Sequence, residues 1–149
     1  MEVKLTLNKT QVKVYFSLYG EDFPIDEVTE RLKVIPTGTY KKGDLIPNRS
    51  TNRYRKESSW DLGTDYQDSL DVNKQLQEIV DKLQNKSLTI NEIKDAYSLE
   101  CKFFIVIIIE NGNTPTLYLN KEIVKFASSI EAEFDVDLYA NPYESNLND

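Results

Sequence analysis

Alternation of apolar and polar residues predicts a strand over residues 10–20 as the first clear element. Its apolar positions fall on every second residue, as expected of a strand that buries one face. These positions are Val12, Val14, Phe16 and Leu18. Residues 3–7 alternate in the same way, and they could either extend this strand or pair with it in a short hairpin.

Apolar residues spaced three or four apart predict four amphipathic helices. The first begins at Pro24, which suits the first turn of a helix, and the second is capped by Ser69 or Asp71. The third has capping-box spacing in residues 89–92, "TINE", and Asn120 caps the fourth. The inward faces would be Ile25, Val28 and Leu32; Val72, Leu76, Ile79, Val80 and Leu83; Ile90, Ile93 and Tyr97; and Ile123, Phe126, Ala127 and Ile130.

Turn-forming residues interrupt the pattern between the first and second helices. Residues 37–53 predict a loop with a short strand at 39–40, and a loop of this length is either functional or mobile. Residues 54–62, "YRKESSWDL", then predict a strand, with Ser59 and Asp61 on its outer face. Its inner face would be Tyr54, Ser58, Trp60 and Leu62.

The most apolar stretch is "CKFFIVIIIE", residues 101–110, which is rich in β-branched side chains. This composition predicts a central strand covered on both faces. Gly112 would turn the chain into a returning strand at 116–119. A final strand over 133–139 would bury its apolar positions, which are Phe134, Val136 and Leu138.

The order of these elements predicts an α+β fold. We expect an antiparallel or mixed sheet with helices mainly on one face, in the manner of a ferredoxin-like fold. The length fits a single domain over residues 1–141, followed by a polar C-terminal tail at 142–149.

Composition narrows the chemistry that this domain can perform. The chain has 149 residues, no histidine and one cysteine, so catalytic pairs with histidine and thiolate zinc clusters are excluded. Cys101 lies in the most apolar strand, where a core role is favoured over a nucleophilic one. A single cysteine agrees with a cytoplasmic protein, and no apolar run is long enough to span a membrane. We expect no cofactor and no metal.

Charge is distributed unevenly along the chain. The net charge of −7 argues against nucleic acid as a partner. Residues 40–57 nevertheless carry six Lys or Arg residues against two acids, whereas no Lys or Arg follows Lys125. The chain therefore combines a basic middle segment with an acidic end.

The basic segment supplies the first set of candidate binding residues, which are Tyr40, Arg53, Arg55, Trp60 and Asp61. Arginines beside aromatic rings are typical of a site for an anion or an aromatic ligand. The alternative is a structural role, in which Trp60 packs in the core and the arginines are solvated. Strand alternation favours this alternative, because one flat surface cannot hold all five side chains.

The acidic end supplies the second set, Glu133, Asp135 and Asp137. At every second position of a strand, these carboxylates would form a row on one sheet face. The row could dock onto a basic protein partner or hold a hard cation. It could also be the solvated side of an edge strand, which the pattern favours.

Four segments resemble an uncharacterised bacterial family, domain of unknown function 4279. They are "FSLYGEDFP" at 16–24, "IPT" with "KKGD" within 35–44, "SSWDLGT" at 58–64, and "CKFFIVIIIENGNTPTLYL" at 101–119. The resemblance covers nearly the whole chain and implies a small, cytoplasmic, single-domain protein. It supplies no catalytic residues.

Two classes of function stay open on this sequence. The first is a non-catalytic protein-interaction module, such as an immunity-type or defence-related protein whose acidic strand binds a basic partner. The second is a domain that binds a small ligand, either an anion or an aromatic compound, or a carboxylate-based hydrolase. A homodimer formed through an edge strand is compatible with either class.

Overall fold

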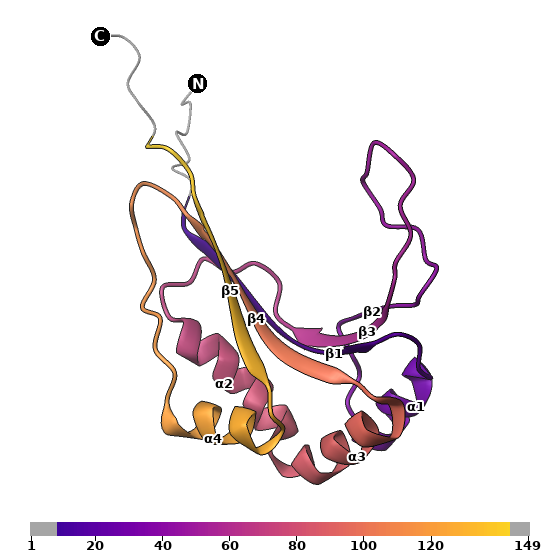
Figure 1. Ribbon diagram of the computed structural model, residues 1–149. Coiled ribbons are helices and arrows are strands. Elements are labelled where there is room, and N and C mark those ends of the chain that lie inside the picture. Colours follow the sequence, from indigo (N-terminus) through magenta and orange to yellow (C-terminus); the bar gives the residue numbers. More distant parts are fainter. Residues whose placement is uncertain (1–8, 144–149) are drawn as a thin grey trace, which may run out of the picture.

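The computed structural model describes residues 9–143 and contains a five-stranded mixed sheet with the order β2-β3-β1-β4-β5 (Figure 1). The strands are β1 (Gln11–Gly20), β2 (Gly38–Tyr40), β3 (Ser58–Gly63), β4 (Glu100–Ile109) and β5 (Glu133–Ala140). β1 is antiparallel to β3 and β4, β2 is antiparallel to β3, and β4 is parallel to β5. The α+β class and the mixed sheet are confirmed, whereas the ferredoxin-like arrangement is not.

All four helices lie on one side of the sheet (Figure 1). They are α1 (Ile25–Leu32), α2 (Val72–Leu83), α3 (Ser87–Tyr97) and α4 (Lys121–Ser129), and the 3-10 turn η1 (Gln84–Lys86) joins α2 to α3. Asp71 accepts a hydrogen bond from the Lys74 backbone, and Asn120 accepts one from Ile123, so both predicted caps are confirmed. The capping box at 89–92 is wrong, because η1 leads directly into α3 and places Thr89 inside that helix.

The core lies between the sheet and these helices. The predicted apolar positions of β1 are all buried there. They lie beside Trp60 and Leu62 of β3 and beside the alternate residues Cys101, Phe103, Ile105 and Ile107 of β4. The Trp60 indole Nε1 donates to Thr29 Oγ1 of α1 at 2.9 Å, which satisfies the one polar group of this fully buried ring.

The segment between β2 and β3 forms an arm, residues 41–57, that rises from the sheet on the side without helices (Figure 1). Backbone hydrogen bonds between its two halves, such as Ile46 N to Arg53 O at 2.7 Å, hold it together as an irregular hairpin. The predicted strand at 54–62 therefore begins only at Ser58. Tyr54 lies on the arm with 58% of its surface exposed, and its predicted place on the inner face of β3 is wrong.

Helices cover only one face of β4, so the predicted burial of both faces is wrong. Phe104, Val106 and Ile108 point to the side without helices and are half-buried. Side chains on this second face pack against side chains of the neighbouring strand instead. The rings of Phe104 and Tyr15, for example, stack with centroids 4.9 Å apart.

Two further predictions near the C-terminal half are wrong. Residues 116–119 form no returning strand, because Thr116 pairs with the chain just before α2, donating its backbone N–H to Leu70 O at 2.9 Å. In β5 only Phe134 reaches the core, while Val136 and Leu138 are 37% and 63% exposed. β5 is an edge strand, and the helices do not cover its outer half, so alternation alone does not bury Val136 and Leu138. Residues 3–7, predicted either to extend β1 or to pair with it in a hairpin, and residues 144–149 of the predicted tail lie outside the described residues.

Candidate functional site

The side of the sheet without helices is hollowed into a groove of about 790 Å³. Its floor and one wall are formed by outward-facing residues of β1, β3 and β4, and the opposite wall by β2 and the base of the arm. The sheet register places Ser17 of β1 beside both Asp61 of β3 and Lys102 of β4. The groove therefore crosses the centre of the sheet, where strands are held by neighbours on both sides.

Polar groups on the groove floor form a short chain of hydrogen bonds. Ser59 Oγ donates to Asp61 Oδ1 at 2.6 Å, and the hydroxyls of Ser17 and Ser59 are 2.8 Å apart. Because Ser59 uses its one proton on the carboxyl group, Ser17 is the donor in the second bond. Burial raises the pKa of Asp61, while the two hydroxyls and the charges of Lys13 and Arg55 oppose this rise.

Aromatic rings form the walls around this floor. Tyr15 lies on Phe104 at one side, and Tyr40 carries the Arg55 guanidinium over its ring at 4.0 Å on the other. Burial, with Asp61 as the next contribution, raises the pKa of Tyr15 to about 12. Burial also raises the pKa of Tyr19, so these phenols stay neutral and act as hydrogen-bonding and stacking surfaces.

Three cations line the groove, namely Lys13, Arg55 and Lys102. Among residues 9–143, the ion pairs within 4.0 Å are Arg31–Glu92 and Lys42–Glu21, so none of the three groove cations has an ion-pair partner there. Lys13 instead lies over the rings of Tyr15 and Tyr66. These cations therefore keep their capacity to bind an external acceptor.

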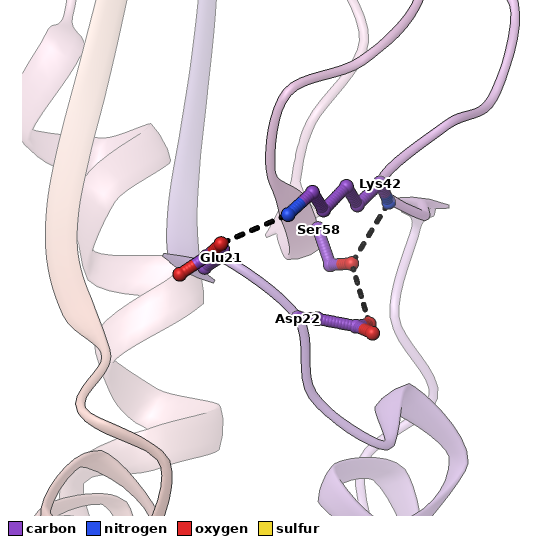
Figure 2. A network of polar contacts seen from close by, with 4 residues as sticks. All are labelled: Glu21, Asp22, Lys42 and Ser58. Carbon is purple, nitrogen blue, oxygen red and sulfur yellow. Dashed lines mark hydrogen bonds and ion pairs between the residues drawn. The ribbon is translucent and has the colours of Figure 1, made fainter.

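A polar network fixes the base of the arm beside the groove (Figure 2). Lys42 Nζ forms an ion pair with Glu21 at 2.9 Å, and the Lys42 backbone N–H donates to Ser58 Oγ at 2.9 Å. Ser58 Oγ in turn donates to Asp22 Oδ1 at 3.5 Å. The ion pair lowers the pKa of Glu21 and raises that of Lys42. These contacts join the arm to the turn between β1 and α1.

The predicted basic and aromatic residues divide between three places. Tyr40, Arg55 and Asp61 line the groove, and Arg53 lines a neighbouring hollow on the arm that shares Tyr40 and Arg55 with the groove. The Trp60 side chain is buried in the core on the helix side of β3, so it does not line the groove. The structural interpretation of Trp60 therefore applies.

The predicted acidic row lies on the same side of the sheet as the groove, on β5. Asp137 lines a second, shallower hollow next to the groove, together with Tyr15 and Tyr139. Glu133 and Asp135 pair in register with Lys102 and Phe104 of β4. No three acidic or thiol side chains within residues 9–143 come close enough together to hold a metal ion.

Sequence reasoning missed the β1 residues that line the groove, among them Tyr15, Ser17 and Tyr19. Their signal was present in "KVYFSLYG", where the side opposite the apolar positions carries two tyrosines and a serine. Cys101 is buried and its thiol lies 3.4 Å from Ile130 O. Burial raises the pKa of this thiol, which agrees with a core role.

Comparison with known proteins places the chain in a family without assigning it a chemistry. A family model described as Domain of unknown function (DUF4279) matches residues 10–141. The chain belongs to this family. The match covers every strand and helix around the groove, so the groove is part of the family's domain. No curated protein and no solved structure matches the chain significantly. Within the described part of the chain, no helix has the length and apolar character needed to cross a membrane.

Proposed function

We propose that this protein is a non-catalytic domain that binds a small polar ligand in the groove on the helix-free side of its sheet. The observation that carries the proposal is the composition of the groove's lining. Neutral tyrosines, a partly desolvated carboxyl group and cations without ion-pair partners face one volume of about 790 Å³. A volume of this size is typical of small-molecule sites, and the polar groups would fix the orientation of the ligand.

Binding is favoured over hydrolysis because the floor holds one carboxyl group whose nearest partners are hydroxyls. Carboxylate-based hydrolysis requires a second carboxyl group that acts as acid, base or nucleophile across the scissile bond. Asp61 accepts from Ser59, and Ser17 completes the chain of hydroxyls. This arrangement orients Asp61, and in the described part of the chain the other two carboxyl groups that line the groove, Glu57 and Asp65, form no hydrogen bond with it.

The test is a screen of a metabolite library by NMR on isotope-labelled protein, with two variants as controls. Gly38→Trp should block binding, because a Cβ at Gly38 meets no atom within 4 Å and Gly38 pairs beside Asp61. Leu88→Trp adds the same ring to an exposed position of α3, on the opposite side of the sheet, and should leave binding unchanged. The proposal fails if no compound shifts groove resonances, or if both variants bind alike.

A second candidate function is docking of a basic protein partner onto β5. The specific observation is that β5 is an edge strand with exposed carboxylates and a 63% exposed Leu138. An edge strand offers unpaired backbone groups to an incoming strand, and its acidic side chains would select a basic one. An immunity-type or defence-related role in a bacterial cytoplasm would be an instance of this function.

A pull-down from the source cell at low and moderate salt tests this second candidate, with Asp137→Lys as the variant. A partner held through β5 should be retained by the parent protein and released by the variant. Retention by both proteins would place the contact elsewhere. Sedimentation of the purified protein would show at the same time whether β5 joins two copies of the chain.

A further inference from the structure

We propose that the ligand of the groove is a small aryl anion, a compound that joins a planar aromatic ring to a phosphate, sulfonate or carboxylate group. The inference rests on the proposed binding function and names its ligand class. In this arrangement Arg55 and Lys102 hold the anionic group over Ser17, and the aromatic ring lies along the Tyr15–Phe104 wall.

Three cations gather in the groove of an acidic protein. Acidic residues outnumber Lys and Arg by 25 to 18, so every cation has abundant acidic side chains available as partners. Among the described residues only Arg31–Glu92 and Lys42–Glu21 form ion pairs within 4.0 Å, so Lys13, Arg55 and Lys102 lack a partner as most cations do. They are distinguished by lining one groove. Lys and Arg side chains without ion-pair partners can donate charge-assisted hydrogen bonds to an oxyanion.

The position of Arg55 also favours an anion. Its guanidinium carbon lies 4.0 Å from the centre of the Tyr40 ring, a cation–π contact. The N–H donors lie in the plane of the guanidinium and stay free for two parallel hydrogen bonds to a carboxylate, sulfonate or phosphate. Tyr40 therefore positions Arg55 for bidentate anion binding without consuming its donors.

The groove also offers a ring surface on the side opposite Arg55, where Lys13 lies over the Tyr15 ring. Tyr15 and Phe104 stack face to face with an interplanar angle of 15°, so each ring leaves its outer face for other contacts. Asp135 is next to Phe104 in the register of β5, and its charge would drive an anionic group away from this wall. The wall thus suits the uncharged part of the ligand, and the anionic group lies toward Arg55.

Asp61 makes binding depend on pH. Its carboxyl group faces charged and titratable groups from four elements, namely Lys13 and Tyr15 on β1, Tyr40 on β2, Lys102 on β4, and Arg55 and Glu57 on the arm, with Asp65 following β3. Since burial already favours the protonated form, a bound anion would favour it further and would gain a hydrogen-bond donor. Affinity for a permanently charged anion should therefore rise as the pH falls from 8 toward the raised pKa of Asp61.

The experiment compares probes of one shape and different charge by NMR titration. Benzenesulfonate is an anion throughout this pH range, benzenesulfonamide is its neutral counterpart, benzylamine is a cation, and methanesulfonate lacks the ring. We expect benzenesulfonate to bind most tightly, with shifts at groove residues. Phenyl phosphate and benzoate, titrated in parallel, distinguish a phosphate from a carboxylate ligand.

Matched variants assign the binding to the proposed residues. Arg55→Gln should weaken benzenesulfonate binding by roughly 10-fold or more, the usual effect of losing a charge-assisted hydrogen bond. Arg53→Gln removes the same charge from the same arm, outside the groove, and should change affinity less than about twofold by screening at moderate salt. Asp61→Asn should tighten binding at pH 8 and abolish its pH dependence.

Several outcomes would overturn the inference. Equal or tighter binding of benzenesulfonamide or benzylamine would show that the groove does not select an anion, while the proposed binding function would stand. If Arg55→Gln and Arg53→Gln weaken benzenesulfonate binding equally, the preference for an anion comes from the net charge of the arm and not from a contact with Arg55. If no probe shifts groove resonances, the inference fails, and the metabolite screen with its Gly38→Trp control decides separately whether the groove binds ligands at all.

Discussion

Replacing Gly63 of "SSWDLGT" by any other residue should destabilise the fold, because its Cβ would overlap with β1. It ends β3 directly opposite Tyr15 of β1, in an antiparallel pair at the edge of the groove floor. A Cβ added at Gly63 would lie 2.7 Å from Tyr15 Cα, and still closer to Tyr15 Cβ and to Val14 O. Because the obstructing atoms belong mainly to the backbone of β1, no rotamer change can relieve the overlap.

The cost of Gly63→Ala follows from this geometry. Added carbon atoms in a packed site usually cost about 1–3 kcal/mol, and we expect the upper end of that range here since the two strands must separate. For a domain of this size, that loss lowers the melting temperature by roughly 6–12 °C, at about 2–4 °C per kcal/mol. Tyr15 would move as well, so the groove would lose part of its aromatic wall.

Urea denaturation of Gly63→Ala and Gly38→Ala in parallel measures the effect. Gly38 lies on β2 with open space around it, so its alanine variant should change the free energy of unfolding by no more than about 0.5 kcal/mol. Both variants add one methyl group to a strand glycine on the same sheet face. Equal midpoints for the two variants would refute the argument that β1 and β3 approach too closely at Gly63 for any side chain.

Three further predictions concern groups whose environments the structure defines. Asp61→Asn should be more stable than the parent protein at pH 7, because the pKa of Asp61 is raised in the folded state, and the difference should close as the pH falls below about 3.9, the ordinary pKa of Asp. Thr29→Val leaves the buried Trp60 N–H without its acceptor, and chemical denaturation should show a loss of about 1–3 kcal/mol. Ultraviolet titration should show Tyr15 ionising at about 12, and Tyr15→Phe should remove that step.

Sequence patterns predicted the elements well where the signal is local. The alternation around Val14 and Phe16 and the caps at Asp71 and Asn120 all depend on residues within a few positions of one another. The sequence also placed Trp60 on the inner and Asp61 on the outer face of β3, because strand alternation leaves no other choice. These features depend little on residues far away in the sequence.

The errors arise where distant parts of the chain decide the outcome. Phe104 and Val106 of β4 are as apolar as buried residues, yet no helix covers them, because all four helices lie on the other side of the sheet. Leu138 alternates as a buried residue should but lies on an edge strand. Tyr54 belongs to the arm, since the hydrogen bonds of that segment run within the arm itself. Strand order and helix placement are not encoded in the local pattern.

The site illustrates the same difference. Tyr40, Arg55 and Asp61 were recognisable as candidate ligands for an anion or a ring, but Ser17 and Lys102 join them only through the register of β1 with β3 and β4. The Cα positions of Ser17 and Asp61 are 44 residues apart in the chain and adjacent in the sheet. A groove floor assembled from three strands has no sequence signature until the strand order is known.

The contacts of the arm determine how far the groove is preorganised for a ligand. Arg55 is tied at both backbone groups, since its N–H donates to Asp44 O at 2.7 Å and its carbonyl accepts from Gly43 N at 2.8 Å. The contacts of Lys42 with Glu21 and Ser58 anchor the same end of the arm to the sheet (Figure 2). An exposed ion pair such as Lys42–Glu21 stabilises a fold little, so its main effect is on the position of the arm. Because Arg55 is already ordered over Tyr40, a ligand need not order this side chain on binding, and more of the interaction energy is retained as affinity.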